Sequence, residues 1–583
     1  MGINGFSNNG YKLWLQYTFI QDQTKRANYQ AQIKSLSVIG KSETMQAVSE
    51  ELKSGIIGMF GAEYYAKIKE VKYKDGEIIC ASETNLRSDI KSVLTEDLMK
   101  INKEGFIIKS LKINGDIKTV ITGKTDVAVL YGVFHFLRLI QTNQSINDLN
   151  INSSPKLNVR LLNHWDNLDR TVERGYAGFS IWDWHRLPDF IDQRYVDYAR
   201  ANASVGINGT VLNNVNANAL ILTPQYLDKV EALAKVLRPY GIKVYLTARF
   251  SAPMEIGGLE TADPLNKKVS AWWKAKVADI YKRIPDFGGF LVKANSEGQP
   301  GPQNYGRNHV DGANMLAEAL EPFKGIVMWR AFVYSEHDST DRAKQAYSEF
   351  VPYDGAFKSN VFVQVKNGPI DFQPREPFHP MFGAMVKTPL MMEFQITQEY
   401  LGQSTHTVFL PKMYEEILNS DTYRKGEGST ITKDIEGSLY NKKLTGIAGV
   451  SNIGNDINWT GNVMLQANWY GYGRLAWNPD LSADLIAEEW LRSTFSNNDR
   501  FVIPVKNMLL NSYEAVVSYM TPLGLHHIMA TGHHYGPGPW VSDLSRPEWN
   551  PVYYHKADNE GVGFDRTATG SNAVEQYASE ISK

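Results

Sequence analysis

Charged side chains follow several short apolar runs in this sequence. The clearest case is the run at 287–294, which leads into Asn295, Ser296 and Glu297 and then into a Gly- and Pro-rich loop. Side chains alternate along an extended strand, so Lys293 and Asn295 share a face and Glu297 follows just beyond them. A cation and a carboxyl group are therefore expected close together at the end of a buried strand. Taken alone, this motif fits an ordinary surface ion pair equally well.

The same pattern recurs at the ends of other apolar runs. Asp371 follows the run at 361–366, and Glu399 follows the run at 389–396. Glycoside hydrolysis requires two carboxyl groups across a cleft, one to protonate the leaving oxygen and one to activate water. A guanidinium or ammonium beside them indicates an anionic substrate, and the cations at these run ends are Lys293, Arg330 and Lys366. Trp165, at the end of an earlier run, offers a flat surface to a sugar ring.

Eight such runs alternate with helical stretches and must position these side chains. They cover residues 160–166, 206–212, 242–249, 287–294, 325–333, 361–366, 389–396 and 446–453, with helical spacing at 226–237 and 312–320 between them. Eight βα units predict a TIM barrel, whose functional residues lie at the C-terminal ends of the strands. The predicted fold class is therefore α/β, with a central (β/α)8 barrel.

Flanking regions suggest two further domains. The first 155 residues predict a small α/β domain, and the Asn- and Ser-rich stretch at 143–155 predicts a linker. After residue 480 the spacing is helical, with Ser482 as the N-cap. The expected domains are 1–155 (α/β), 156–478 (catalytic barrel) and 479–583 (mostly helical). Within the first domain we expect helices at 42–65 and 125–139 and strands at 77–81, 105–113 and 117–121.

Composition excludes several classes of partner. The 583-residue chain carries 61 basic and 63 acidic residues, a net charge of −2, so nothing favours nucleic acid or an anionic membrane. Cys80 is the single cysteine, which excludes a disulfide framework and a thiolate metal cluster, and we expect it in the core. No window of about 18 apolar residues predicts a membrane span. The first ten residues have no export-signal pattern; we expect a periplasmic or extracellular enzyme, with the cytoplasm as the alternative.

From the linker nearly to its end, the chain resembles the α-glucuronidases of glycoside hydrolase family 67. The matching motifs are long and contiguous: NHWDNLD at 163–169, ERGYAG at 173–178, VKANSEGQPGP at 292–302, VKNGPIDFQPREP at 365–377 and EFQITQEYLG at 393–402. The resemblance implies a three-domain enzyme that removes 4-O-methyl-D-glucuronic acid, α-1,2-linked to the terminal xylose of xylooligosaccharides, with inversion. It implies no cofactor.

The resemblance also implies roles for individual residues. Glu297 would be the general acid, and Asp371 and Glu399 would share the role of base. Trp165 would stack on the sugar and Val215 would lie near the methyl ether, while the uronate or its hydroxyls would be held by Lys293, Arg330 and Lys366.

The C-terminal region departs from this family. The chain ends within a predicted helix at 572–581, so we expect an incomplete C-terminal domain, and the homodimer that the family implies would need the complete one. The loop at 531–540 is expected to reach over the barrel mouth, with Trp540 touching sugar. A zinc site is a poor alternative, because no carboxylate or cysteine accompanies the paired histidines at ligand spacing; these are His526, His527, His533 and His534.

Two other functions fit the same sequence less well. A different uronate-directed or amino-sugar glycosidase could use the same barrel, because fold does not fix function. Release of 4-O-methylglucuronate from aldouronic acids, without release from aryl hexosaminides, separates these activities. A non-catalytic carbohydrate-binding protein would lack an acid or a base, and all three carboxyl groups are present here.

Overall fold

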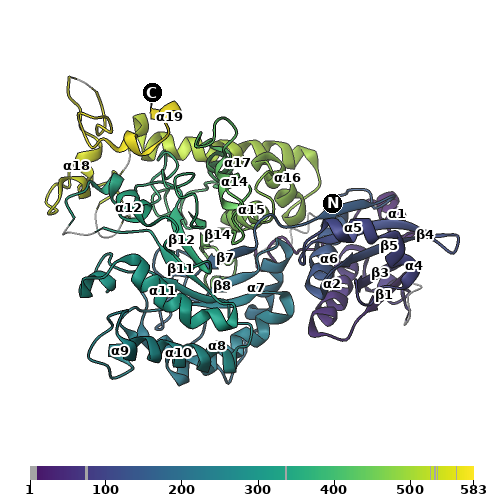
Figure 1. Ribbon diagram of the computed structural model, residues 1–583. Helices are drawn as coiled ribbons and strands as arrows, with labels where there is room; N and C mark the ends of the chain where they lie inside the picture. The colour runs from purple at the N-terminus through teal and green to yellow at the C-terminus, as the bar shows by residue number, and fades with distance from the viewer. Residues whose placement is uncertain are drawn as a thin grey trace.

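The computed structural model describes residues 9–71, 77–334, 338–525, 527–530, 534, 536–559 and 561–582. A mixed sheet with its helices lies beside a barrel, and the C-terminal helices lie against the barrel (Figure 1). This arrangement confirms the predicted α/β class with a central TIM barrel and flanking domains. The exact domain boundaries remain a prediction.

All eight predicted barrel strands are present. In the described residues they form one closed parallel barrel: β7 Val159–Asn163, β8 Gly209–Val211, β9 Lys243–Thr247, β10 Gly289–Val292, β11 Ile326–Arg330, β12 Val361–Lys366, β13 Leu390–Gln395 and β14 Gly446–Val450. Alternate side chains such as Leu291, Met328 and Phe362 fill the interior, while Phe290, Val327 and Val363 pack into the outer core. The barrel is therefore a solid core, and its chemistry must lie at the strand ends.

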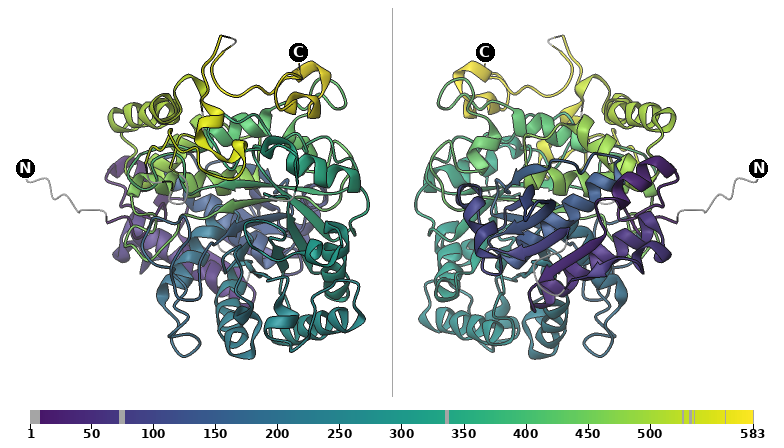
Figure 2. Two further views of the ribbon diagram at one scale, coloured as in Figure 1. Left: turned by 90° about the vertical axis from the view of Figure 1, so that its left-hand side faces the viewer. Right: turned by 90° about the vertical axis from the view of Figure 1, so that its right-hand side faces the viewer.

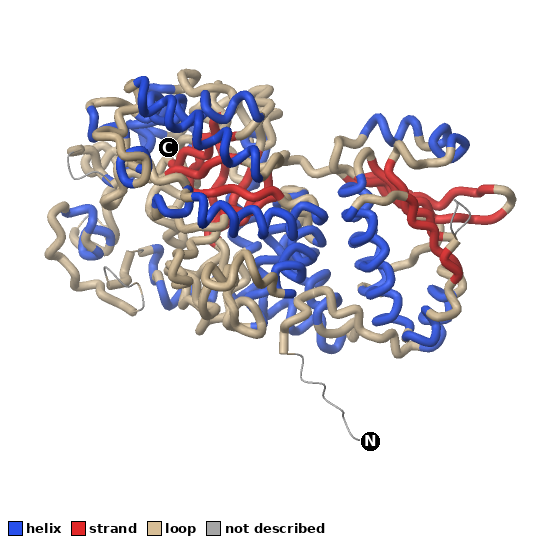
Figure 3. Tube along the Cα trace, turned by 90° about the horizontal axis from the view of Figure 1, so that it is seen from below, coloured by secondary structure: helices blue, strands red, loops and turns tan. Residues whose placement is uncertain are grey.

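Amphipathic helices pack against the barrel strands, and the view from below shows helices beside these strands (Figure 3). The helical spacing at 226–237 and 312–320 is confirmed by two of these helices. The main covering helices are α7 Gln193–Ser204, α8 Pro224–Leu237, α10 Lys267–Arg283, α11 His309–Leu320, α12 Arg342–Phe350, α13 Pro411–Asn419 and α15 Gln466–Trp477. Their apolar faces pack on the outward-facing strand residues, which leaves the polar strand ends open to the loops.

The N-terminal region contains a six-stranded sheet in the described residues, in the order β2-β1-β3-β5-β4-β6. Its central strands match the prediction, and Cys80 is buried in one of them. Helix α2 ends at Gly61, whose φ of 91° breaks the expected single helix. The elements are β1 Ser35–Ile39, α2 Glu43–Phe60, α3 Ala62–Tyr65, β2 Lys69–Glu70, β3 Ile78–Ser82, α4 Ser88–Val93, α5 Thr95–Lys100, β4 Phe106–Ile113, β5 Asp116–Gly123, α6 Asp126–Gln141 and β6 Asn150–Ser153.

The predicted linker at 143–155 is in part a strand, so that prediction was wrong. Strand β6 pairs antiparallel with β4, from Phe106 opposite Ser153 to Lys109 opposite Asn150. Asn and Ser have low strand propensity, but an edge position lets their side chains face solvent while the backbone pairs. Pairing across the sheet outweighed the local composition.

The C-terminal region begins with two long helices and continues in loops. Ser482 accepts a hydrogen bond from the Leu485 amide at 3.2 Å, which confirms it as the N-cap of α16 Ala483–Thr494. Helix α17 Asp499–Met520 follows. The helix expected at 572–581 was wrong, because extended Tyr577 separates two short turns, η9 Ala573–Gln576 and α19 Ser579–Ser582. In Figure 2 these last turns are the yellow segment beside the label C, at the edge of the molecule.

In the described part of the chain, every helix is too short or too polar to cross a membrane.

Candidate active site

A cavity of about 760 Å³ opens where the barrel strands end. Residues 295–300, after β10, line one wall, and Asp371 and Tyr400 line it from the loops after β12 and β13. The C-terminal region contributes Leu544 and Trp549. Residues that are far apart in sequence thus meet at the face of the barrel where the strand-end pattern predicted chemistry.

Glu297 lies in this cavity beside a buried lysine. Lys293 Nζ lies 2.5 Å from Glu297 Oε2 and also donates to Asn216 Oδ1 at 2.9 Å. Positive φ angles at Asn295 (54°) and Glu297 (47°) turn the chain sharply after β10 and bring the two side chains together. About half of the Glu297 side chain is exposed (50%). Burial raises the pKa of Glu297, but the Lys293 ammonium outweighs it and holds the pKa below its usual value.

Asp371 is held by three partners. Lys366 pairs with one carboxylate oxygen, and the Tyr400 hydroxyl donates to the other at 2.7 Å. Arg342 Nη2 lies 3.9 Å from the same oxygen as Tyr400. Burial raises the pKa of Asp371, yet the charges of Lys366 and Arg342 dominate and place it well below its usual range. Asp371 is therefore an ionised carboxylate in this site.

Glu399 lies just behind the cavity wall. Arg174 Nε lies 2.7 Å from its Oε1, and His534 Nδ1 lies 2.6 Å from the same oxygen. The Gln395 amide donates to the other oxygen at 2.6 Å. Arg174 and His534 both line the cavity, whereas Glu399 is buried. Glu399 is therefore separated from the cavity by the two side chains that hold it, Arg174 and His534.

Arg330 differs from the other two predicted cations. Lys293 and Lys366 contact carboxylates at the cavity, whereas Arg330 forms a two-point ion pair with Glu393, at 3.0 Å and 2.8 Å. Both side chains of this pair are 1% exposed. Neither residue lines the cavity, and the guanidinium is 5.6 Å from the ring of Trp165.

The apolar cluster that fills the barrel interior extends to the cavity, which Tyr400 lines. Trp165 and Val215 are buried in this cluster together with Phe372 and Tyr400. Trp165 lies near Arg330, and Tyr400 of the same cluster contacts Asp371.

Trp540 is not among the residues that line the cavity, and its contact with sugar stays a prediction. Its side chain is 72% exposed, and among the described residues the aromatic from this region that lines the cavity is Trp549. Sequence reasoning also assigned no role to Arg174, Arg342 or Tyr400. Arg174 and Tyr400 were within motifs that carried the family resemblance, which was the available signal; Arg342 had none.

The histidines considered for zinc have other contacts. His527 pairs with Arg342 through Nε2 at 3.0 Å and stacks on Tyr554, and burial together with Arg342 lowers the pKa of His527 to about 3. His534 contacts Glu399. His526 and His533 lie outside the described residues. Among those described, no cluster of three His, Cys, Asp or Glu is arranged to hold a metal.

The chain is similar to known glycoside hydrolases over most of its length. Three family models cover most of the chain: the glycosyl hydrolase family 67 N-terminus at 13–136, the middle domain at 139–459 and the C-terminus at 460–583. "Probable alpha-glucuronidase A" of Aspergillus clavatus is 36% identical over 99% of this chain and 68% of its own length. "Alpha-glucuronidase A" of Emericella nidulans is 36% identical over 100% of this chain and 69% of its own length.

A solved structure shows the same fold at low sequence identity. A GH138 enzyme targeting pectin rhamnogalacturonan II aligns with a TM-score of 0.53 and 13% identity, over 83% of this chain and 55% of that one. The family evidence rests on the sequence matches. The chain therefore belongs to glycosyl hydrolase family 67, the family of the α-glucuronidases that it matches, and is a glycoside hydrolase.

Proposed function

We propose that the chain, as an α-glucuronidase, hydrolyses the α-1,2 bond between (4-O-methyl-)D-glucuronic acid and the terminal xylose of xylooligosaccharides, with inversion. The observation that carries this proposal is the charge of the site. In the described residues, four Lys and Arg side chains pair with three carboxylates: Lys293 with Glu297, Lys366 and Arg342 with Asp371, and Arg174 with Glu399.

Among these seven groups the cations outnumber the carboxylates by one, and the Arg330–Glu393 pair is balanced. Glu173, whose charge also acts on Arg174, is held by Asn214 and Asn216 and is not part of this set. A neutral sugar would gain little from this excess, whereas a uronic acid brings one carboxylate to match it. The excess becomes larger still when one carboxyl group is protonated for acid catalysis. The site is suited to a substrate with a single negative charge.

In this proposal Glu297 is the general acid. In the free protein Lys293 lowers the pKa of Glu297, so its proton must be gained when substrate binds. The carboxylate of a bound uronate would attract the ammonium of Lys293 and weaken its effect on Glu297, and the sugar would exclude water. Both changes raise the pKa of Glu297, so the substrate itself would produce the acid form.

Asp371 is the better placed base. It lines the cavity and stays ionised, while Glu399 is buried behind Arg174 and His534. We infer that Asp371 takes the proton of the attacking water and that Glu399 shares the task by orienting that water. Glu297 follows β10 and Asp371 follows β12, so the two approach from different strands. Inversion requires a water between the base and the sugar, which corresponds to about 6.5 to 9.5 Å between the two carboxyl groups.

The remaining predicted residues would bind the sugars. Trp165 and Val215 would form the apolar floor under the uronic acid and its methyl ether, and Lys293, Lys366 and Arg330 would hold its oxygens. The aromatic contact to the xylose falls to Trp549 in this proposal, because Trp549 lines the cavity and Trp540 is exposed elsewhere.

The test is the product formed from short aldouronic acids. Proton NMR of the first uronic acid released, before mutarotation, should show the β-anomer. The α-anomer appearing first would overturn inversion, and release from aryl hexosaminides without release from aldouronic acids would overturn the substrate. Polymeric glucuronoxylan, assayed in parallel, is expected to react poorly, because the proposed site takes a terminal xylose.

A further inference from the structure

We propose that Arg566 is a positioning residue for Asp371, acting through Glu376 in the loop that carries this carboxylate. The inference rests on the proposed role of Asp371 as base. Arg566 comes from the C-terminal segment, 190 residues after Glu376.

The loop after β12 needs support from outside. It leaves the barrel at Asn367, and two of its residues, Phe372 and Arg375, have φ angles of 53° and 64°. Residues other than glycine adopt this left-handed region at a cost, and they stay there only when their surroundings hold them. Phe372 follows Asp371 directly, so whatever holds the loop also sets the direction of the carboxylate.

Glu376 joins the two ends of this loop. A Cβ at Gly368 would lie 2.6 Å from the Glu376 Cβ, so the loop folds back until Glu376 packs on its first residues. The Glu376 side chain is fully buried at this point (0% exposed). A buried carboxylate needs a cation with good geometry, because removing its partner leaves an uncompensated charge.

Arg566 supplies that cation with both of its terminal nitrogens. Nη1 lies 3.2 Å from Glu376 Oε2, and Nη2 bonds to Oε1. Such two-point pairing fixes direction as well as distance. Burial lowers the pKa of Arg566, but the charge of Glu376 outweighs it, so the guanidinium remains protonated.

The same C-terminal region contacts the loop at other points. The His527 amide donates to Gln373 Oε1 at 2.8 Å, and the Tyr577 hydroxyl donates to the Phe378 carbonyl at 2.8 Å. Ile370, directly before Asp371, is buried in a small cluster with Tyr554 and Ala573 of the C-terminal segment. The loop is therefore held on both sides of Asp371. Two of its contacts with the C-terminal region are charged, the buried pair of Glu376 with Arg566 and the more exposed pair of Arg375 with Glu514.

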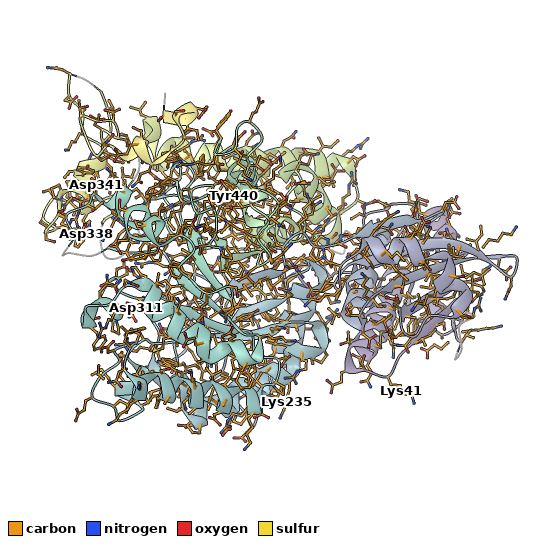
Figure 4. All side chains as sticks on the ribbon, viewed as in Figure 1. Lys41, Lys235, Asp311, Asp338, Asp341 and Tyr440 are labelled. Carbon is orange, nitrogen blue, oxygen red and sulfur yellow. The ribbon has the colours of Figure 1, made fainter. Side chains whose placement is uncertain are left out.

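The start of α12 is anchored to this segment too. The Tyr553 hydroxyl donates to Asp341 at 2.7 Å, and Arg546 bonds to the carbonyl of Asp338. Figure 4 shows Asp338 and Asp341 on the side of the molecule where the C-terminal segment lies. Arg342, which follows Asp341, is a partner of Asp371. Asp371 and one of its cations are thus placed by the same stretch of chain.

The experiment compares four variants with the unmodified chain: Arg566→Met, Arg566→Lys, Arg566→Met combined with Glu376→Gln, and Lys344→Met. Lys344 is the matched control, because its ammonium pairs with Glu575 of the same segment at 2.6 Å and so tests the loss of a cation from another ion pair of this segment. Release of uronic acid from aldouronic acids gives kcat and KM over a range of pH, and thermal unfolding gives Tm.

For Arg566→Met we expect kcat to fall about 10- to 100-fold with little change in KM, the scale of a small misplacement of a catalytic group. The acidic limb of the pH profile should move to higher pH, because a displaced Asp371 loses contact with its cations. The double variant should regain Tm without regaining kcat, Arg566→Lys should recover part of kcat, and Lys344→Met should keep the original kcat and profile.

Equal kcat and pH profile in Arg566→Met and in the unmodified chain would overturn the inference. So would full recovery of kcat by the double variant, because the stranded charge of Glu376 would then explain the defect. If the unmodified chain released no uronic acid, the proposed function itself would fail, which is a different outcome from an active chain that tolerates the loss of Arg566.

Discussion

The ammonium of Lys293 lies 2.5 Å from the carboxylate of Glu297, four residues further along the chain. The lysine is buried and has Asn216 as a second partner, whereas half of the Glu297 side chain is open to the cavity. In the proposed mechanism, Glu297 is ionised and paired with Lys293 in the free protein, and a bound uronate would weaken this pair. A substrate anion and a catalytic proton are thereby linked through one lysine.

Replacing Glu297 by Ala should lower kcat on natural xyloside leaving groups by about 10²-fold or more, the scale of general acid catalysis. A substrate with a very good leaving group needs little protonation and should lose much less. Rates on both kinds of substrate, measured with the same enzyme preparation, check this. Equal losses on the two would show that Glu297 is not the acid. Asp371→Ala should impair both substrates alike.

Replacing Lys293 by Met should raise the pKa of Glu297, because the cation that lowers it is removed while the Asp371 charge, which raises it, remains. The general acid must be protonated, so its pKa sets the alkaline limb of the profile for kcat/KM. That limb should move to higher pH, and KM for the uronate should rise. An alkaline limb that stays in place would separate Lys293 from the acid. Lys344→Met is a suitable control, since Lys344 is not among the residues that line the cavity.

Replacing Tyr400 by Phe should make the base, Asp371, easier to protonate. The hydroxyl donates to Asp371 at 2.7 Å and favours the ionised form, so its loss raises the pKa of Asp371. A base must be ionised, and the acidic limb of the pH profile should therefore move to higher pH. The fall in kcat/KM should correspond to about 1.5 to 3 kcal/mol, the range for a hydrogen bond to a charged group.

The control for this change is Tyr64→Phe. That hydroxyl donates to the Gln30 carbonyl at 2.6 Å in the N-terminal domain, far from the cavity. The Tyr64→Phe change also removes one tyrosine hydroxyl, and it should leave the pH profile unchanged. A shift in both variants would point to a general loss of stability.

Replacing Arg330 by Met should destabilise the fold by about 3 to 5 kcal/mol, because it leaves Glu393 as an unpaired buried charge. Urea unfolding, followed by tryptophan fluorescence, measures this. Changing Glu393 to Met as well removes the stranded charge and should restore much of the stability. A single variant as stable as the unmodified chain would contradict the importance of the pair. The ratio of activity on the uronate to that on its neutral glucosyl analogue, measured well below Tm, then reports whether Arg330 also binds the carboxylate.

Sequence alone determined the barrel and the carboxyl groups at its mouth. Each barrel strand is a short apolar run covered on both faces, so its burial appears directly in the composition. Polar residues follow these runs because the strand ends are where the chain leaves the core. Glu297, Asp371 and Glu399 could therefore be assigned to one end of one barrel before any distance was known.

Only the tertiary structure decided the partners of these groups. In the sequence Arg330 is a cation at a strand end, as Lys293 and Lys366 are. In the structure it pairs with Glu393 of β13, which is two strands away in the barrel. Residues 150–153 looked like linker, yet pairing with β4 made them a strand. Trp549, and not Trp540, lines the cavity because the fold of the C-terminal loops sets which ring points inward. Ion pairing, sheet pairing and loop direction all depend on contacts between residues that are distant in sequence. Local sequence patterns therefore cannot predict these contacts.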